Sequence, residues 1–145
     1  MNSEQFLAAI SDCCDQALTE AQFRPVYTRV FTPDTAILDL IRALKPLCKV
    51  GLIAETSHWR FEDGLHPLDI FPLLDAVSLS WELGGARPVL WQDALAKLGI
   101  MAEECAYVDA RSAFALAATG NLLHGLPYSN PEALQAALRR LKIRL

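Results

Sequence analysis

The sequence predicts an α/β protein of three layers, in which helices cover both faces of a mostly parallel sheet of about four strands. From Lys49 onward, short apolar runs alternate with segments whose apolar residues recur at helical spacing. These runs are apolar on both faces, which is typical of parallel strands buried between two helical layers. With 145 residues, 52% of them apolar, the chain has the size and composition of a single domain.

Three helices are expected before the first strand. Each begins with residues that can accept hydrogen bonds from the free N–H groups of a first helical turn, and each carries an apolar stripe. The expected capping residues are Asn2 with Gln5, Thr19 with Gln22, and Thr32 followed by Pro33 and Asp34. Pro46 ends the third helix. The single domain of residues 1–145 therefore divides into a helical segment at 2–45 and an α/β core at 46–145.

Four strands and four helices are expected in the core. The apolar runs lie at residues 49–55, 76–80, 105–110 and 122–126, and helical patterns lie at 58–64, 88–98, 111–120 and 131–142. Sites in parallel α/β sheets form at the carboxyl ends of the strands. Here those ends are residues 54–57, 80–87, 109–111 and 127–130.

Composition and charge argue against several classes of partner. A net charge of −4 does not fit a general nucleic-acid binder, which needs a concentrated basic surface. No apolar run approaches the roughly 20 residues of a membrane helix, and the acidic residues close to Met1 do not fit a signal peptide. We therefore expect a cytoplasmic protein with no nucleic-acid or membrane partner.

The four cysteines show no spacing typical of a metal site. Cys13 and Cys14 are adjacent, so that their side chains point about 100° apart on a helix. Cys48 and Cys105 are isolated in the sequence. All four are expected to be reduced and mostly in the core.

The ordered segments resemble the haloacid dehalogenase (HAD) superfamily of hydrolases, in the branch with a helical cap between its first and second strands. The end of the cap and the returning helix correspond to "LTEAQFRPVYTRVFTPDTAILDLIRALKP", and the second strand and its loop to "VGLIAETSHWRFEDGL". The third strand and the following loop correspond to "DAVSLSWELGGARP", and the fourth and fifth strands to "CAYVDARSAFALAATGNLLHGL". The resemblance covers essentially the whole chain. It implies a Rossmann-like three-layer sandwich preceded by a helical segment resembling part of a cap.

Catalysis in that superfamily uses four groups, of which the first is a D-x-D motif at the end of the first strand. Its aspartates supply the nucleophile and the acid. The aspartates before the second strand of the resemblance are Asp12, Asp15, Asp34 and Asp39, and none ends a strand-like run. The resemblance therefore implies that the sequence begins inside the cap and lacks the first strand, as in a truncated or degenerate member.

The second and third groups are altered. Where the family has a Ser or Thr, this chain has Ala54 and Glu55, followed by Thr56 and Ser57. Either hydroxyl could reach a phosphate from a shifted loop or cap the helix that follows. Arg87 takes the place of the family's lysine. Its planar guanidinium group can hold an anion, but it does not replace the compact ammonium group of a lysine.

The fourth group is a pair of acids, for which this chain has Asp109 and Ala110. Mg2+ normally relies on more than one carboxylate, so we expect no metal site and no cofactor unless a complementing D-x-D strand is present. Asp109 is expected to pair with Arg87 or Arg111, or to cap the next helix. No catalytic residue is assigned. The vestigial site comprises Asp109, Arg87, Thr56 and Ser57, and the candidate anion-binding residues are Arg87 and Arg111.

Other catalytic patterns have less support. Ser57 and His58 are adjacent but no orienting acid can be identified for them in the sequence. His66 and His124 are isolated. The pair Gly84-Gly85 lacks the spacing of a nucleotide-binding loop.

The missing strand would lie in the middle of the sheet, between the second and fourth strands of the family. Residues 50–54 and 106–109 could pair directly, another chain could insert a strand, or the sequence could be one piece of a longer or split protein. We expect direct closure to a four-stranded sheet. The N-terminal helices are then expected to repack on the core or on a second copy in a homodimer.

Three functions follow from these expectations, and whether the chain is an enzyme stays open among them. The loss of all four groups favours a catalytically inactive HAD-like protein with a regulatory or interaction role, as a homodimer or with a protein partner. The alternative is a phosphatase-like HAD hydrolase whose nucleophile strand is supplied by an upstream segment or another chain. A small-anion binder using Arg87 and Arg111 is the third.

Overall fold

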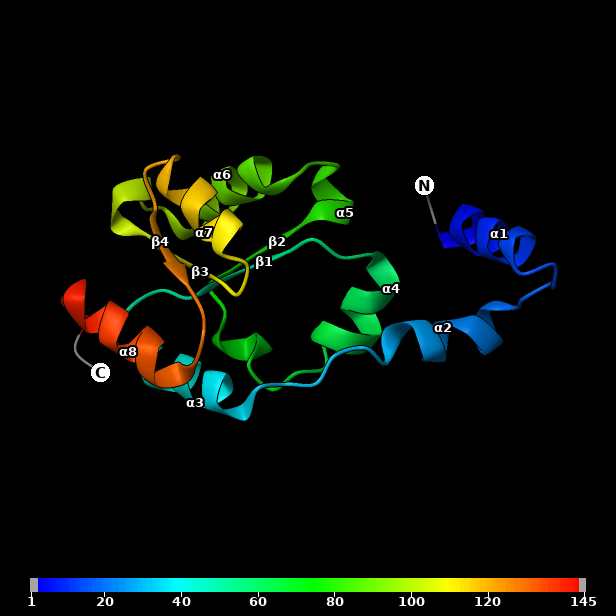
Figure 1. Cartoon of the computed structure of the whole chain (residues 1–145), viewed down its shortest axis with the longest axis horizontal. Coiled ribbons are helices and arrows are strands. Elements are labelled where there is room, and N and C mark those ends of the chain that lie inside the picture. The colour runs from blue at the N-terminus through cyan, green and yellow to red at the C-terminus, as the bar shows by residue number, and fades with distance from the viewer. Residues whose placement is uncertain (1–2, 144–145) are drawn as a thin grey trace.

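The computed structural model describes residues 3–143 and confirms the α/β class. The helices are α1 (Ser3–Cys13), α2 (Glu20–Thr28), α3 (Thr35–Leu44), α4 (His58–Arg60), α5 (Ser80–Leu83), α6 (Arg87–Leu98), α7 (Ser112–Thr119) and α8 (Pro131–Arg140). The strands are β1 (Gly51–Ala54), β2 (Ala76–Leu79), β3 (Ala106–Asp109) and β4 (His124–Pro127). A π-helical turn (Phe61–Leu65) follows α4, and 3-10 turns lie at Phe71–Leu73 and Ala102–Glu104. Figure 1 shows the order of these elements along the chain.

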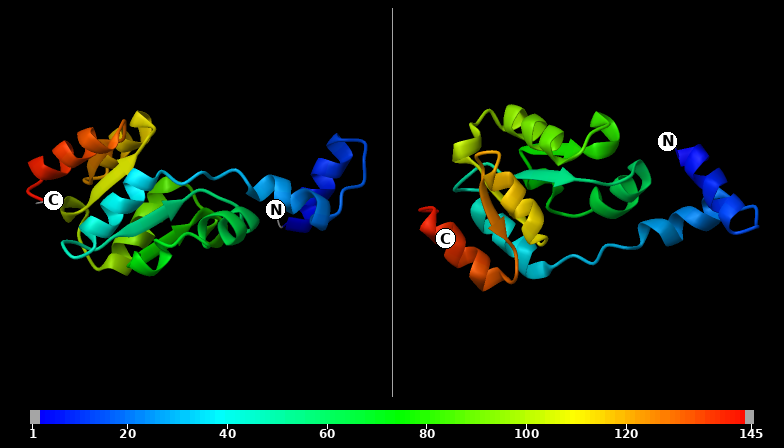
Figure 2. Two further views of the ribbon diagram at one scale, coloured as in Figure 1. Left: turned by 90° about the horizontal axis from the view of Figure 1, so that it is seen from below. Right: turned by 45° about the horizontal axis from the view of Figure 1, so that its top comes forward.

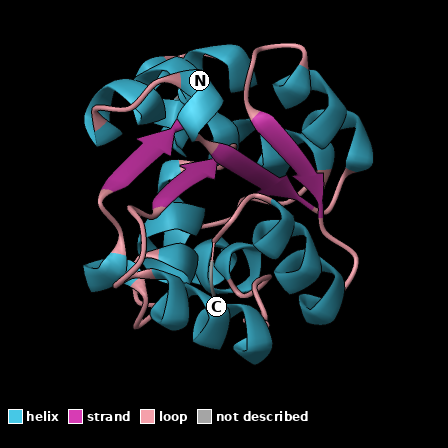
Figure 3. Ribbon diagram, turned by 90° about the vertical axis from the view of Figure 1, so that its left-hand side faces the viewer, coloured by secondary structure: helices cyan, strands magenta, loops and turns pink. Residues whose placement is uncertain are grey.

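The strands form two separate two-stranded parallel sheets. β1 pairs with β2, and β3 pairs with β4 (Figure 3). The expected direct pairing of residues 50–54 with 106–109 is therefore wrong within residues 3–143. Ile53 of β1 and Tyr107 of β3 both pack against a buried cluster centred on Trp91, and Arg87 extends between the ends of the two strands. These side chains connect the two sheets, whose backbones form no common ladder of hydrogen bonds.

Helices cover both sides of the strands, as the apolar runs predicted. On one side α6 packs against β1 and β2, and α7 packs against β3 and β4 (Figures 1 and 3). On the other side, Leu40 of α3 joins Leu134 and Leu138 of α8 in a buried cluster. Ala106 of β3 packs against this cluster. The arrangement is a three-layer sandwich around two short sheets.

The predicted helix starts are confirmed at α2 and corrected at α3. The Thr19 N–H donates to Oε1 of Gln22 at 3.0 Å, as a capping box requires. The third helix begins at Thr35, not after Thr32 and Pro33, because Asp34 is the cap: its carboxylate accepts from the N–H groups of Ala36 and Ile37. The predicted cap Asn2 lies outside the described residues.

The helices α1 and α2 form an arm that projects from the core, as Figure 2 shows. The ring of Phe6 in α1 packs against Phe23 and Tyr27 in α2, with ring centroids 5.9 and 5.1 Å apart. No residue of α1 is buried. The prediction that the cysteines lie mostly in the core is wrong for this reason at Cys13 and Cys14, which are exposed with the arm.

The other two cysteines lie in the core domain. Cys48 is exposed in the turn after α3, so the prediction of a core position is wrong there too, and only Cys105, before β3, is half-buried. Burial raises the pKa of the Cys105 thiol. Among residues 3–143 the longest helix has 12 residues, and none is long and apolar enough to cross a bilayer.

Candidate functional site

Arg87 joins the ends of two strands that belong to different sheets. Its Nη1 donates to Oε2 of Glu55, directly after β1, and its Nη2 donates to Oδ2 of Asp109, the last residue of β3, at 3.2 Å. Its Nε donates to the hydroxyl of Tyr107 at 3.0 Å. Only 8% of Arg87 is exposed. We refer to Glu55, Arg87, Tyr107 and Asp109 as the Arg87 cluster.

The turn before α6 places Arg87 at this position. Gly84 ends α5 with a φ of 63°, a left-handed conformation that glycine adopts without the steric penalty of a Cβ atom. Ala86 is extended and precedes the helix, and Pro88 lies in its first turn, where a missing N–H is tolerated. The side chain at the first position of α6 is thus directed to the carboxyl ends of β1 and β3.

An aromatic ring covers the arginine side chains. The guanidinium carbon of Arg87 lies 3.6 Å from the centre of the Phe114 ring in α7, and that of Arg111 lies 4.0 Å from the same ring. Both distances are within the range of a cation–π interaction. Phe114 therefore stabilises Arg87 on the side that its carboxylate partners leave free.

Asp109 accepts hydrogen bonds from four groups. Oδ2 accepts from the hydroxyl of Tyr107 at 2.7 Å in addition to Arg87, and Oδ1 accepts from the backbone N–H of Arg111 at 2.8 Å and from its Nε at 3.5 Å. Burial raises the pKa of Asp109, but these hydrogen bonds and the two arginine charges outweigh it and bring the pKa below its ordinary value. Asp109 is thus held as a carboxylate, and the expected pairing with Arg87 and Arg111 is found.

Tyr107 and Phe114 are site residues that the sequence predictions missed. Tyr107 precedes Asp109 by two residues in β3, and alternate residues of a strand share a face, so this spacing could have indicated their contact. Burial, followed by the hydrogen bond to Asp109, raises the pKa of Tyr107. Phe114 follows Arg111 by three residues, a spacing at which side chains of a helical turn can meet.

Thr56 and Ser57 lie beside the Arg87 cluster in sequence but take part in other contacts. Oγ of Ser57 accepts from the N–H of Arg60 at 3.4 Å, so Ser57 caps α4 as the sequence allowed, and it also accepts from the Tyr27 hydroxyl at 3.2 Å. The Thr56 N–H donates to Oγ of Ser80 at 3.1 Å. Among residues 3–143, neither hydroxyl is hydrogen bonded to Arg87 or Asp109.

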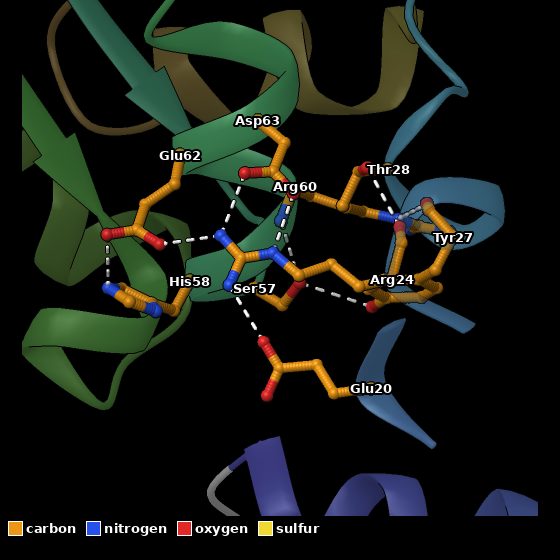
Figure 4. A network of polar contacts seen from close by, with 9 residues as sticks. All are labelled: Glu20, Arg24, Tyr27, Thr28, Ser57, His58, Arg60, Glu62 and Asp63. Carbon is orange, nitrogen blue, oxygen red and sulfur yellow. Dashed lines mark hydrogen bonds and ion pairs between the residues drawn. The ribbon is translucent and has the colours of Figure 1, made fainter. Parts of the chain in front are cut away.

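A second polar network attaches α2 to the core (Figure 4). Nε and Nη2 of Arg24 donate to the two carboxylate oxygens of Asp63 at 2.7 and 2.8 Å. The same guanidinium contacts Glu20 at 2.9 Å and Glu62 at 3.0 Å. The hydrogen bond from Arg24 brings the pKa of Asp63 below its ordinary value. Arg24 is therefore the main ionic link between the arm and the turn after α4.

An open aromatic cleft of about 770 Å³ lies between the arm and the strand ends. Its wall includes Phe6 of α1, Tyr27 of α2, Trp59 of α4 and Trp81 of α5. His58 lies in the same wall, with its ring 4.7 Å from that of Trp81 and its Nε2 3.1 Å from Glu62. The predicted hydroxyls Thr56 and Ser57 also line this cleft, so the structure groups them with the arm and not with Arg87.

No cluster of three or more His, Cys, Asp or Glu side chains suited to a metal ion occurs in residues 3–143. Glu55 and Asp109 are the carboxylates of the Arg87 cluster, and both are bonded to the cation between them. With Arg111 included, two carboxylates face two guanidinium groups, so the formal charges balance. The assignment of Arg87 and Arg111 to an anion site stays a prediction.

The chain is a Rossmann-like α/β protein, because helical layers cover its parallel strands and the polar residues of the site lie at the carboxyl ends of those strands. No family model and no curated protein sequence matches the chain. Among solved structures, the chain is similar to one described as a predicted HAD-like family hydrolase from Porphyromonas gingivalis, with a TM-score of 0.75 and 20% identity. The match covers 100% of this chain and 75% of that one. The chain thus has a HAD-like fold, as the sequence segments predicted.

Proposed function

We propose that the chain is a catalytically inactive HAD-like protein with a regulatory or interaction role. The observation that carries the proposal is the closed Arg87 cluster. The cation in the place of the family's lysine is bonded to Glu55 and Asp109, and the latter is the carboxylate that would have to help hold a metal. A phosphate at this position would have to displace carboxylates from a buried guanidinium, which is unfavourable.

The aspartates that precede β1 also support this proposal. Asp12 and Asp15 are exposed at the end of the arm, and Asp34 is the N-cap of α3. Asp39 lies on α3, where it pairs with Arg42 at 2.6 Å. None of them is placed to attack a substrate beside Asp109, and covalent catalysis needs an activated nucleophile.

Hydrolysis of p-nitrophenyl phosphate by the full chain, with Mg2+ and with EDTA, tests the proposal. We expect no Mg2+-dependent turnover above the buffer rate. Mg2+-dependent turnover that Asp109→Ala abolishes and Asp12→Ala retains would overturn it. Asp12→Ala is the matched control because this carboxylate is exposed on α1, away from the Arg87 cluster.

A phosphatase-like hydrolase whose nucleophile strand comes from an upstream segment or another chain is the second candidate. The observation that favours it is that β1 and β3 belong to separate two-stranded sheets, so that each has one edge without a strand partner in residues 3–143. This candidate requires the chain to fold poorly by itself. A cooperative thermal transition of the 145-residue chain alone, with full amplitude by circular dichroism, counts against it.

The interaction role requires a partner, and a second copy of the chain is one candidate. The arm and the turn after it have exposed apolar residues, which are Val26 in α2 at 74% and Val30 after α2 at 52% exposure. Apolar patches of this kind are typical of contact surfaces. Sedimentation velocity at high micromolar concentration distinguishes a homodimer from a compact monomer, and a compact monomer would leave a different protein as the partner.

A further inference from the structure

Helix α7 is apolar on all sides, although its outer face is exposed to solvent. It contains no charged residue, and its inner residues Ala115 and Ala118 are buried, the latter in the Trp91 cluster. Ala113, Leu116 and Ala117 lie at helical spacing on the other face and are exposed, Leu116 to 74%. A helix that is apolar all round is typical of a position covered on both sides. Residues 3–143 cover only one side of α7.

A leucine ends this helix at a position where glycine is usual. The N–H groups of Leu122 and Leu123 donate to the carbonyls of Thr119 and Ala118, each at 3.1 Å, which are the two hydrogen bonds of a Schellman motif. Leu122 therefore takes the left-handed position of the motif, with a φ of 70°, which is sterically unfavourable for a residue with a Cβ atom.

The side chain of Leu122 gains little from the fold in return. Leu122 is 64% exposed and belongs to neither buried cluster of the described residues. Both its backbone conformation and its exposure are unfavourable in the isolated chain, and burial against another molecule would offset the exposure. We refer to Ala113, Leu116, Ala117 and Leu122 as the α7 face.

The charge pattern identifies what can cover the α7 face. Residues 112–131, between Arg111 and Glu132, contain no Asp, Glu, Lys or Arg, and no other stretch of the chain without these residues is as long. The chain has a net charge of −4, so two copies repel each other where their charged surfaces meet. At the α7 face two copies can meet without bringing like charges together. An uncharged face also offers no charged group that would select a partner of opposite charge.

We propose that the α7 face is the contact surface of a two-fold symmetric homodimer, in which Leu116 and Leu122 of each copy pack against α7 of the other. A two-fold contact uses the same surface on both copies, so that surface must complement itself, and an uncharged apolar helix face does. The small side chains of Ala113 and Ala117 allow the two helices to approach closely. The inference rests on the proposed interaction role and names both the partner and the surface.

Sedimentation velocity of the full chain, from low to high micromolar concentration, tests the proposal. We expect a reversible monomer–dimer equilibrium. Leu116→Glu places a charge in the apolar contact and is expected to weaken dimerisation by about tenfold or more. Val26→Glu is the matched control, because Val26 is also 74% exposed and the change in charge is the same, but it lies on the arm, away from α7 (Figure 1). This variant should dimerise like the wild type.

Leu122→Gly separates a contact residue from a structural one. Glycine adopts a φ of 70° without the steric penalty, so the midpoint of urea unfolding at the lowest protein concentration is expected to be unchanged or higher than that of the wild type. Dimerisation is expected to weaken in the same variant. A residue that only supports the fold of the monomer would lower the midpoint when removed.

Amide hydrogen exchange measured at low and high protein concentration locates the contact. We expect exchange in residues 112–123 to slow by about threefold or more as the dimer forms, with little change in residues 20–28 of α2. Leu116→Glu should show no such dependence on concentration. Slower exchange in α2 alone would place the contact on the arm.

Three results would overturn the proposal. They are a monomer at every concentration, equal weakening of the dimer by Leu116→Glu and Val26→Glu, and a dimer that only Val26→Glu weakens. Phosphatase turnover is read separately. A dimer through α7 with Mg2+-dependent turnover would refute the inactive assignment and leave the contact surface in place, whereas a monomer without turnover would refute the contact surface alone.

Discussion

Nη2 of Arg87 lies 3.2 Å from Oδ2 of Asp109, and only 10% and 12% of the two side chains are exposed. The pair joins α6, which covers the first sheet, to the end of β3 in the second. Because the two sheets share no ladder, Arg87 connects them through its bonds to Glu55 after β1 and to Asp109 and Tyr107 of β3. The stability of the core should therefore depend on Arg87.

Replacing Arg87 with methionine is expected to destabilise the protein by about 3–5 kcal/mol, since a nearly buried Asp109 then retains only its longer 3.5 Å ion pair with the exposed Arg111 side chain. Urea unfolding at pH 7, followed by circular dichroism, measures the change. Arg139→Met, at an exposed arginine of α8, is the control and is expected to alter the free energy of unfolding by no more than about 0.5 kcal/mol. Equal midpoints for both variants would contradict a structural role for the Arg87 cluster.

The depressed pKa of Asp109 predicts a loss of stability in acid. Its ordinary pKa is 3.8, and in the folded protein the hydrogen bonds from Arg111 and Tyr107 and the arginine charges bring it lower despite burial. The unfolded chain therefore binds a proton first as the pH falls. The contribution of Asp109 is present above its unfolded pKa and is lost as the pH falls through the folded value.

Urea unfolding at several pH values between about 6 and 2.5 measures this dependence, with the proton-binding change taken from the slope. In Asp109→Asn the free energy of unfolding is expected to be lower at pH 7 and to fall less steeply in acid. Asp12→Asn, on the exposed α1, should retain the wild-type slope. A wild-type slope in Asp109→Asn would mean that other carboxyl groups account for the acid sensitivity.

Close packing of β4 against α7 predicts a large effect of a single methyl group. A Cβ atom at Gly125 would lie 1.9 Å from the carbonyl oxygen of Ala115 and 2.6 Å from Oγ1 of Thr119. Gly125→Ala is therefore expected to cost about 3 kcal/mol, because the strand must move away from the helix. At Gly120 the nearest atom is 3.4 Å away and φ is −63°, so Gly120→Ala should be nearly neutral in the same urea measurement. A comparable loss in both variants would refute the packing argument.

The sequence predicted the strands well because their signal is local. Each apolar run became a strand, and Asp109 ends β3 as its pattern indicated. The sequence places the cap of α3 two residues too early because Thr32 and Asp34 are both good caps. In the structure Asp34 is the cap, and its carboxylate also accepts from the Tyr128 hydroxyl at 2.8 Å. The local sequence pattern does not predict that contact.

The pairing of the sheets and the composition of the site depended on long-range contacts. Direct pairing of β1 with β3 is predicted if only the unpaired backbone groups of the two strands are considered. In the structure, side chains of the Trp91 cluster and Arg87 lie between the two sheets. Glu55 lies 32 residues from Arg87, and Phe114 meets Arg87 from a different helix. Such partners follow from how the layers pack, which residue spacing does not specify.

The link between the arm and the core can be tested at Arg24. Arg24→Met removes the hydrogen bonds to Asp63, Glu62 and Glu20, all of which are partly exposed. We expect less than about 1 kcal/mol of change in global stability but faster amide exchange in α2 relative to α3. Arg29→Met, just after α2, is the matched control. Unchanged exchange in α2 would show that the aromatic contacts of Tyr27 and Trp59 hold the arm without the ionic network.

The predicted anion site at Arg87 and Arg111 can be tested by the melting temperature in sulfate, because the bonds of Arg87 to Glu55 and Asp109 predict no sulfate-dependent rise, whereas an open anion site predicts one. Arg111 is the accessible member, with 60% of its side chain exposed, and it faces the same Phe114 ring as Arg87. Sulfate bound with a dissociation constant of about 1 mM would, at about 10 mM, add about 1.4 kcal/mol of stability, or a rise of about 5 °C for a domain of this size. We expect no such rise at constant ionic strength, and a rise that disappears in Arg111→Ala and in Arg87→Ala would show that the anion site is open. Arg139→Ala would retain such a rise, and an equal rise in all three variants would assign the effect to general exclusion of sulfate from the protein surface.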